Sequence, residues 1–278
     1  MNERRWRALR RNRAAMVGAG VIALVLLAAL LADVVAPHAP AARQPDLRAE
    51  PSAKYWLGTD DNGFDVFSRM VHGARSSLAV AVFAVALALG VGVPLGLVAG
   101  WRGGWTDGLI MRAMDVLLAF PSVLLAIAIA AALDERSLRT VVIAVAVVMV
   151  APFVRQVRAA VIQVRNHEYV TASRALGSGP ARILFRTVLP NCLAPILVLA
   201  TLSTGVAILD AAGLSFLGLG PPDTAPEWGV MLTAGFRFML RPEQWILLPP
   251  GIAIAVTVLG FNLFGDGLRD AYDPRRAG

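Results

Sequence analysis

The sequence contains almost no cysteine, lysine or histidine. Of its 278 residues, one is a cysteine (Cys192), one is a lysine (Lys54) and three are histidines (His38, His72 and His167). A single cysteine excludes an intrachain disulfide and a zinc site built from cysteines. Because no two histidines stand at metal-ligand spacing, we expect no metal site.

Having only one lysine also excludes a nucleotide-binding loop of the Walker A type. That loop reads Gly-x-x-x-x-Gly-Lys-Ser/Thr, because its lysine must reach the β- and γ-phosphates. Lys54 lies in Pro-Ser-Ala-Lys-Tyr and has no such glycine frame. We therefore expect no nucleotide cofactor and no catalytic residues in this chain, so any ATP chemistry belongs to another polypeptide.

Charged residues are scarce and hydrophobic residues are abundant. Charged side chains make up 16% of the chain, against roughly 25% in soluble domains, and hydrophobic ones make up 57%. The mean hydropathy is +0.64. The net charge of +7 comes from arginines that flank apolar stretches and do not form one basic face. This pattern favours contact with membrane lipid and argues against nucleic acid as a partner.

Six apolar segments are long enough to cross a membrane, which takes roughly 20 residues in a helix. The first could instead be a cleaved signal peptide, but its apolar run exceeds the roughly 7–15 residues usual for such a signal. We therefore predict an all-α, polytopic membrane protein with six transmembrane helices. The predicted spans are Ala14–Ala36, Ser77–Gly100, Leu109–Leu133, Leu138–Val157, Cys192–Leu217 and Ile246–Asp266.

The basic residues predict how these spans are oriented, because arginine is enriched on the cytoplasmic side of membrane proteins. Arginines crowd the segment before the first span, so the N-terminus is predicted to be cytoplasmic. Six spans then place the C-terminus and residues 158–191 on the same side, and residues 37–76 outside. The internal arginines are Arg4, Arg5, Arg7, Arg10, Arg11, Arg13, Arg102, Arg112, Arg155, Arg158, Arg165, Arg174, Arg182, Arg186, Arg269, Arg275 and Arg276.

The internal connection at residues 158–191 has the pattern of two short helices joined by a tight turn. Tyr169–Leu176 is the first predicted helix, which Gly177 ends. Ala181–Val188 is the second, which Pro190 stops. Small side chains in the first helix leave room for another protein to approach closely. We therefore predict a compact docking element on the cytoplasmic side.

Small and charged residues inside the spans indicate how the helices pack. Gly92, Gly96 and Gly100 repeat every four residues, a spacing that lets two helix backbones approach closely. We expect these glycines to serve helix packing and not ligand binding. Arg112 and Asp115 are three residues apart, so they share a helix face and could pair.

Asp210 lies well inside the fifth predicted span, where an ionised carboxylate costs at least about 3 kcal/mol. Two interpretations stay open. The carboxylate could line or gate a pathway, or it could be hydrogen-bonded to a neighbouring helix. Phe216, at the end of the same span, is a second candidate for the pathway or its gate.

The connection at residues 158–191 resembles the Glu-Ala-Ala-x-x-x-Gly loop of binding-protein-dependent importer permeases. Thr171-Ala172-Ser173 occupies the place of Glu-Ala-Ala, and Gly177 occupies that of the glycine. The dipeptide/oligopeptide branch usually reads close to Glu-Tyr-Val-x-Ala-Ala-Arg-Ala-Leu-Gly, which the sequence from Glu168 to Gly177 matches except at Ser173.

Further motifs extend the resemblance over nearly the whole chain. They are similar to those of the C-type permease subunit of dipeptide, oligopeptide and nickel importers, although Phe64 stands where arginine is usual. The matching segments are Arg11–Ala15, Leu57–Asp60, Asp65–Arg69, Ala119–Pro121, Leu214–Gly220, Trp228–Leu232, Gly265–Asp270 and Asp273–Arg275.

The resemblance implies a type I ABC importer permease fold in the inner membrane, with partner proteins. The chain would form a heterodimer with a second, unlike permease subunit. Two cytoplasmic ATPase subunits, which use ATP and Mg²⁺, would each receive one such loop, and an extracytoplasmic binding protein would deliver the substrate. The residues implied in ATPase coupling are Glu168, Tyr169, Thr171, Ala172, Ser173, Arg174, Leu176, Gly177, Pro180, Arg182 and Pro190.

The chain then divides into three parts. Residues 1–76 hold the basic N-terminal segment, the first span and an external loop. Residues 77–268 form the permease domain, with its coupling loop at 158–191, and residues 269–278 form a cytoplasmic tail.

Other classes of membrane protein fit the residues less well. An ion-coupled secondary transporter often has ionisable residues in several spans and related halves, whereas only Asp210 is convincing here. A membrane enzyme would need a cluster of catalytic side chains, and none is visible. Within the importer family the residues leave the substrate open among dipeptides, oligopeptides, nickel complexes and glutathione.

Overall fold

The structure is a computed structural model that describes residues 9–272. Within this range the β pairing is limited to two isolated bridges, between Arg43 and Phe64 and between Thr59 and Asp65. The predicted all-α class is therefore confirmed.

Parts of the two predicted cytoplasmic ends lie outside the described residues. They are the N-terminal segment with Arg4, Arg5 and Arg7, and the end of the tail with Arg275 and Arg276. These arginines contribute to the predicted orientation through the sequence alone.

Helices account for most of the described chain. Five of them are long and apolar enough to cross a membrane, and a bent pair, α5 and α6, makes a sixth crossing when the two are counted together. The elements are α2 (Arg13–Leu30), α3 (Ala32–Val35), α4 (Val66–Arg102), α5 (Gly104–Leu118), α6 (Ser122–Leu133), α7 (Leu138–Arg165), α8 (Glu168–Ala175), α9 (Pro180–Ile183), the π-helical turn η1 (Leu184–Val188), α10 (Leu189–Phe216), α11 (Trp228–Phe236), the 3₁₀ turn η2 (Gln244–Ile246) and α12 (Leu248–Tyr272).

The third predicted span is broken in the middle. Within the predicted span Leu109–Leu133, α5 and α6 meet at an angle of 89°, so the span is not one straight helix. The break falls at Phe120 and Pro121. Proline has no backbone N–H to donate, and it disfavours the helical conformation in the residue before it.

Two spans are longer than hydropathy predicts. The second begins at Val66 and not at Ser77, and the fourth continues to Arg165 and not to Val157. The 37 residues of α4 make a helix about 55 Å long, which exceeds the ~30 Å hydrocarbon layer of a membrane. Polar turns at the helix ends therefore extend beyond the apolar segments that hydropathy detects.

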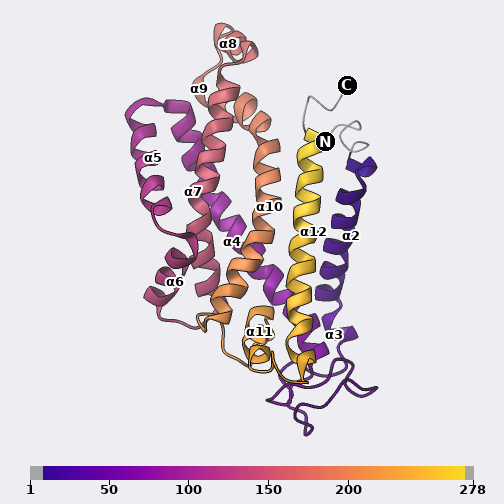
Figure 1. Ribbon diagram of the computed structural model, residues 1–278. Coiled ribbons are helices and arrows are strands. Elements are labelled where there is room, and N and C mark those ends of the chain that lie inside the picture. The colour runs from indigo at the N-terminus through magenta and orange to yellow at the C-terminus, as the bar shows by residue number, and fades with distance from the viewer. Residues whose placement is uncertain (1–8, 273–278) are drawn as a thin grey trace.

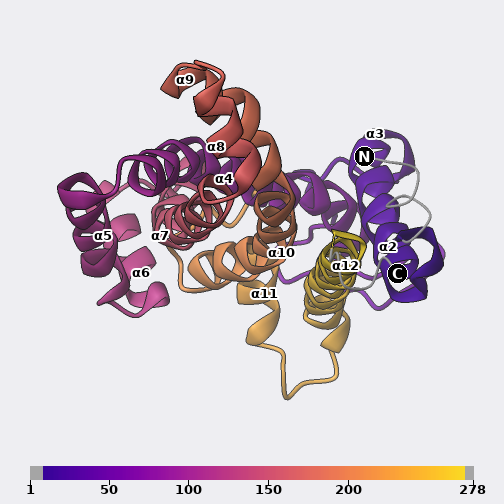
Figure 2. The ribbon, with the colours of Figure 1, turned by 90° about the horizontal axis from the view of Figure 1, so that it is seen from above.

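The long helices form one bundle (Figure 1). Helices α4, α7 and α10 pack against one another, α12 lies against α10, and α2 packs on α12. On the other side of α7 lies the bent pair α5–α6 (Figure 2). The start of α2 and the end of α12 lie at the same end as α8, which we call the elbow end. Residues 37–65 and α11 lie at the opposite end, which we call the loop end.

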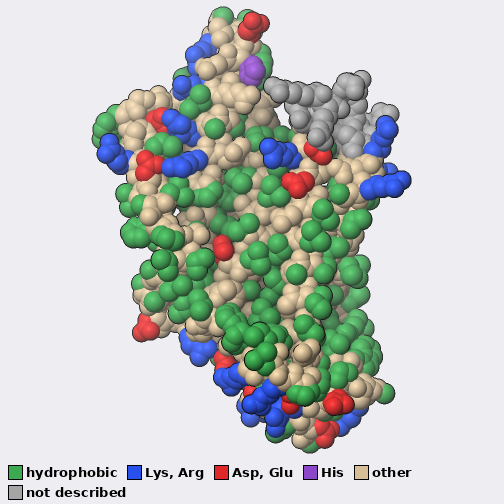
Figure 3. Space-filling view, in the orientation of Figure 1, with side chains coloured by type: hydrophobic (Ala, Val, Ile, Leu, Met, Phe, Trp, Pro, Cys, Tyr) green, Lys and Arg blue, Asp and Glu red, His purple; other side chains and the backbone are tan. Residues whose placement is uncertain are grey.

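The surface is divided along the bundle axis. Hydrophobic side chains cover the middle of the molecule, and most charged side chains gather toward its two ends (Figure 3). Large apolar side chains such as Leu24, Phe83 and Leu124 are more than half exposed. This distribution is the one expected of a protein whose middle is surrounded by lipid.

The most extensive helix contact in the described bundle joins α4 and α7. It is lined by three glycines of α4, at each of which an added Cβ atom would lie 2.7–2.8 Å from a Cβ atom of α7. Only glycine therefore permits the observed approach. The pairs are Gly92 with Phe153, Gly96 with Val157, and Gly100 with Val161. The prediction that these glycines serve helix packing agrees with this geometry, in which small residues at a four-residue spacing bring two backbones together.

We expect Gly96→Ala to destabilise the bundle by about 1–3 kcal/mol, because an added Cβ would also meet the carbonyl oxygen of Val154 at 2.8 Å. The matched control is Gly90→Ala in the same helix, where an added Cβ meets nothing within 4 Å. Thermal unfolding of the two purified variants in detergent measures the difference. Equal unfolding midpoints would contradict this account of the α4–α7 contact.

Candidate coupling elbow and pathway face

The chain makes a sharp reversal between α7 and α10, and we call residues 168–183 the elbow. Its first helix, α8, matches the predicted helix to within one residue at each end. The helix ends in a Schellman motif, in which the N–H of Ser178 donates to Ser173 O at 3.1 Å and that of Gly177 to Arg174 O at 2.9 Å. Gly177 has a φ of +78°, which favours glycine.

The second half of the elbow does not end where the sequence predicts. Helix α9 continues through η1 into α10, so the prediction that Pro190 stops a separate helix is wrong. In η1 each backbone hydrogen bond reaches one residue further than in an α-helix. The N–H of Leu189, for example, donates to Leu184 O. Pro190 has no backbone N–H to donate, and its ring crowds the preceding turn of the helix. The wider π-helical turn accommodates this proline within a continuous helix.

Three apolar side chains anchor the elbow to the bundle. Val170, Ile183 and Val188 are at most 1% exposed. They belong to a buried cluster that includes Val157 and Val161 of α7. Sequence analysis missed these anchors, although a large aliphatic residue in an otherwise polar loop is a usable signal of burial.

The predicted coupling residues lie on the outside of the elbow and, for Pro190, in the first turn of α10. Leu176 is 87% exposed and Phe185, in the following turn, is 60% exposed, which is unusual for large apolar side chains at a polar end of a protein. Ser173 is half-buried, and the exposed residues are Glu168, Tyr169, Thr171, Ala172, Arg174, Leu176, Gly177, Pro180, Arg182 and Pro190.

Arginines tie the base of the elbow to the neighbouring helices. Arg165 donates from Nη1 to Gly100 O at 2.6 Å, at the C-terminal end of α4 where carbonyl groups lack helical partners. The Arg174 guanidinium lies 5.4 Å from the centre of the Trp101 ring. Arg158 makes a two-point contact with Asp107 of α5, at 2.5 and 2.6 Å.

The suggested pairing of Arg112 with Asp115 is wrong. Asp115 accepts a hydrogen bond from Arg155 of α7 at 2.7 Å. Contact between α5 and α7 brings these two side chains together, and spacing along one helix could not reveal it.

Helix α10 carries both residues predicted for the pathway, on different sides of the helix because they are six residues apart. Asp210 is half-buried and has no hydrogen-bond or ion-pair partner among residues 9–272. Val206, one turn before Asp210, is 48% exposed, and Leu217, which follows the end of the helix, is 56% exposed. Since a carboxylate facing lipid is costly, the face of α10 that carries Asp210 is suited to water or to another protein. Phe216 packs edge-on against Phe236 of α11, with ring centres 5.4 Å apart.

At the loop end, the short helix α11 is fixed to α4 by a buried carboxylate. Glu227 is 2% exposed and accepts the N–H groups of Gly229 and Val230 at 2.9 and 3.0 Å. It also accepts the hydroxyl of Ser77 at 3.1 Å. The indole N–H of Trp228 donates to Met70 O at 3.0 Å. No local pattern predicts this contact, because Ser77 and Glu227 are 150 residues apart.

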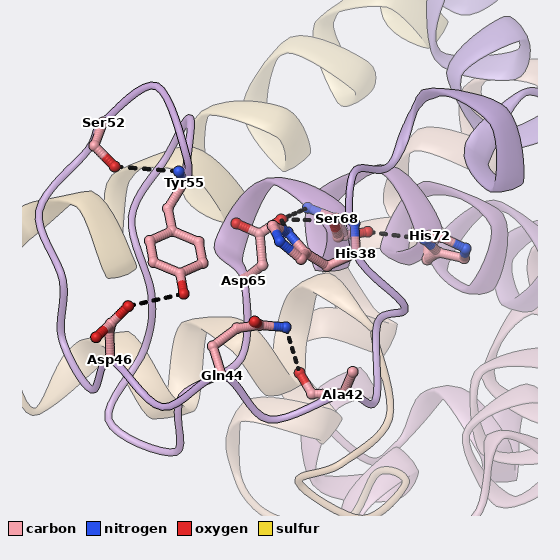
Figure 4. Close-up of polar contacts among 9 residues, drawn as sticks. All are labelled: His38, Ala42, Gln44, Asp46, Ser52, Tyr55, Asp65, Ser68 and His72. Atoms are coloured by element: carbon pink, nitrogen blue, oxygen red, sulfur yellow. Dashed lines mark hydrogen bonds and ion pairs between the residues drawn. The ribbon is translucent and has the colours of Figure 1, made fainter.

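Residues 37–65 fold back on the start of α4 through polar contacts (Figure 4). Asp46 accepts hydrogen bonds from Lys54 at 2.8 Å and from the Tyr55 hydroxyl at 3.0 Å. The hydrogen bond to Asp46 raises the pKa of Lys54 to about 12, and it lowers the pKa of Asp46. Asp65 caps α4 by accepting the N–H and hydroxyl groups of Ser68.

Acidic and histidine side chains are spread over the molecule. Within residues 9–272, no three His, Cys, Asp or Glu residues are grouped so that they could hold a metal ion.

Comparison with known protein families identifies the chain. The profile of the binding-protein-dependent transport system inner membrane component matches residues 92–278. The chain belongs to this family. The profile of the N-terminal transmembrane domain of oligopeptide transport permease C matches residues 3–52 of the permease. The resemblance seen in the sequence motifs is therefore confirmed.

Several transport permeases are similar to the chain over 97% of its length. A dipeptide transport system permease of Alkalihalophilus pseudofirmus is 49% identical, with 88% of that protein covered. A di/tripeptide transport system permease of Pseudomonas aeruginosa is 46% identical, with 91% covered. A glutathione transport system permease of Pectobacterium atrosepticum is 42% identical, with 90% covered.

The fold also agrees with that of a solved ABC importer. The chain superimposes on an inward-facing structure of the MetNI methionine ABC transporter with a TM-score of 0.62 and 17% identity, covering 74% of this chain and 98% of the other. The permease therefore has the ABC importer fold that the motifs imply.

We expect Gly177→Ala to lower the free energy of local opening of the elbow by about 1–2 kcal/mol, because alanine is strained at a positive φ. Gly179→Ala is the matched control, since both positions have open space around an added Cβ but Gly179 has a φ of −67°. Hydrogen exchange measured at residues 173–178 should be faster in the first variant alone. Equal exchange in both variants would show that the backbone angle is not what holds the turn.

Proposed function

We propose that this chain is one of two unlike permease subunits in an ATP-driven importer of dipeptides or oligopeptides. Membership of the permease family supports this proposal, and the observation that carries it is the elbow. Its helix projects from the bundle with exposed apolar side chains, yet its base is anchored by a buried core. That combination suits a surface that receives force from another protein.

The proposed source of that force is a pair of ATPase subunits, which bind ATP and Mg²⁺. Each permease subunit would insert its elbow into a groove of one ATPase. The exposed Leu176 and Tyr169 would supply apolar contact, and the exposed Arg174 and Arg182 would supply charge. Absence of a Walker A sequence in the chain supports placing nucleotide hydrolysis in separate subunits.

Displacement of the elbow would move several helices together. Arg165 joins its base to the end of α4, and α9 and η1 continue directly into α10. Movement of the elbows toward each other would therefore rotate α7 and α10 as packed bodies. Such rigid-body rotation is a common way to open a pathway alternately to the two sides of a membrane.

The orientation in the membrane is proposed from charge. The elbow end carries Arg155, Arg158, Arg165, Arg182 and Arg186, and the positive-inside rule places such an end in the cytoplasm. Both termini would then be cytoplasmic. The loop end would face outward, where a substrate-binding protein would deliver its cargo.

The second permease subunit is proposed to cover the exposed face of α10. The half-buried carboxylate of Asp210 on that face needs water or a polar partner. A pathway between two permease subunits would provide either. This arrangement favours the pathway role for Asp210 over a hydrogen bond to a neighbouring helix of the same chain.

Peptides are the substrate class best supported by the relatives. Two of those described above are named for dipeptide or di/tripeptide transport and one for glutathione, itself a tripeptide. These substrates share amide groups, a carboxylate and a cationic amine. An ion-coupled mechanism has less support, because the relatives are named as subunits of transport systems.

We expect Ala172→Asp to abolish uptake and ATPase assembly while membrane insertion stays intact. The new carboxylate would be desolvated in the ATPase groove, at a cost of several kcal/mol. Ala53→Asp, at an exposed position of the loop end, is the matched control. Co-purification of the ATPase with each variant measures assembly. Recovery of a fully active Ala172→Asp complex would overturn the proposed docking site.

We expect Asp210→Asn to reduce peptide uptake at least about tenfold, a change of about 1.4 kcal/mol, with assembly unaffected. The charge-preserving variant Asp210→Glu is the control and should retain more uptake. Transport assays in proteoliposomes compare the two. If Asp210→Asn transports peptide as fast as the parent and is more stable than it, the carboxylate contributes only its cost of desolvation. The pathway role would then be wrong.

A further inference from the structure

A buried arginine joins two distant segments at the loop end. Arg69, in the first turn of α4, is 3% exposed. Its Nη1 donates to Asp60 Oδ2 at 3.2 Å. Its Nη2 donates to the backbone oxygens of Asp223 at 2.7 Å and Ala225 at 2.9 Å. The guanidinium also lies 4.5 Å from the centre of the Phe64 ring.

Each side of this contact is a defined structural unit. Asp60 is held by the loop itself, because its Oδ1 accepts the N–H groups of Asn62 at 2.9 Å and Phe64 at 2.8 Å. On the other side, residues 221–227 have no regular structure and lead directly into α11. Carbonyl groups in such a segment need donors, and Arg69 supplies them.

The segment that Arg69 holds leads into α11, which contacts the C-terminal end of α10. Thr233 of α11 donates to Phe216 O, the last residue of α10, at 3.2 Å. The Phe216 and Phe236 rings are also in contact. A shift of residues 221–227 would therefore move α11 relative to the end of α10.

Stability alone explains this arginine poorly. A buried ion pair often contributes no more than an apolar replacement would, because desolvation of the charges offsets their attraction. The Nε of Arg69 is buried and has no hydrogen-bond partner among the described residues, which adds to the cost. What the planar guanidinium offers is several donors in a fixed geometry, which lysine lacks.

We propose that Arg69 is a positioning residue that fixes α11 at the outer end of the pathway to the loop of residues 58–65. We call these contacts the Arg69 clamp. The proposal rests on the proposed transport function, and it gives a role to the motif at Leu57–Asp60 and Asp65–Arg69. Two exposed ion pairs nearby, Arg136 with Asp223 and Arg237 with Asp61, would add little.

The test uses the complete transporter with its binding protein, carrying Cys192→Ala so that the introduced cysteines are the only ones in this chain, and with partner subunits free of accessible cysteines. A spin label at Thr224→Cys reports the mobility of the clamped segment, which is exposed there. Arg69→Gln removes the clamp. Arg69→Lys keeps the charge beside Asp60 but cannot reproduce the three-way contact.

Arg75 offers a matched control on the same helix. It also binds a carboxylate, that of Asp33, at 3.1 Å and a backbone oxygen, that of Ala29, at 3.1 Å. These partners belong to α2 and α3 and not to the segment before α11. Arg75→Gln and Arg75→Lys therefore remove contacts of the same kind, at a more exposed site, without releasing residues 221–227.

We expect both Arg69 variants to mobilise the label and to lower the maximal rate of binding-protein-stimulated ATP hydrolysis at least about fivefold. The concentration of loaded binding protein giving half-maximal stimulation should stay within about twofold, because the exposed docking surface is unchanged. Both Arg75 variants should match the parent. Full rescue by Arg69→Lys, or equal effects in the Arg75 variants, would refute the clamp.

If the Arg69 variants do not assemble, a distance measurement on the parent complex replaces them. Spin labels at Asn62→Cys and Thr224→Cys should keep a constant separation through the ATP cycle, because the clamp joins the two segments. A change in this separation would overturn the proposal. Failure of ATP-driven uptake by the parent complex would instead contradict the proposed function, while the distance would still report on the clamp.

Discussion

Close approach of α4 and α7 is the constraint on which the rest of the molecule depends. In lipid there is no hydrophobic force between helices, so association relies on packing and polar contacts. The glycine row at Gly92, Gly96 and Gly100 lets the two backbones meet. Because α4 is 37 residues long, this contact aligns structures at both ends of the bundle, the elbow at one and the loop of residues 37–65 at the other.

Arginines bound to backbone carbonyls recur at both ends. Arg165 binds the end of α4 near the elbow. Arg75 binds the end of α2, and Arg69 binds the segment before α11. Carbonyl groups at helix ends and in irregular segments have no helical donor, and a guanidinium can donate to them. Short polar contacts of this kind set the helix ends relative to one another.

Two exposed features of the chain are suited to contact with other proteins. A carboxylate half-buried on α10 and an 87% exposed leucine at the tip of the elbow are unfavourable in an isolated membrane protein. The two features lie on different parts of the bundle, as the proposal of two different partners requires. Their separation is consistent with a subunit that receives movement at one surface and moves substrate along another.

The amino-acid sequence by itself determined the helical class, the approximate spans, the elbow helix and the family, because apolar length, glycine and proline act over a few residues. Only the tertiary structure decided the continuous helix through Pro190, the buried anchors Val170 and Ile183, and the partners of Arg69. Those features depend on side chains that are distant in the chain and meet only after the helices pack, so no local pattern could specify them.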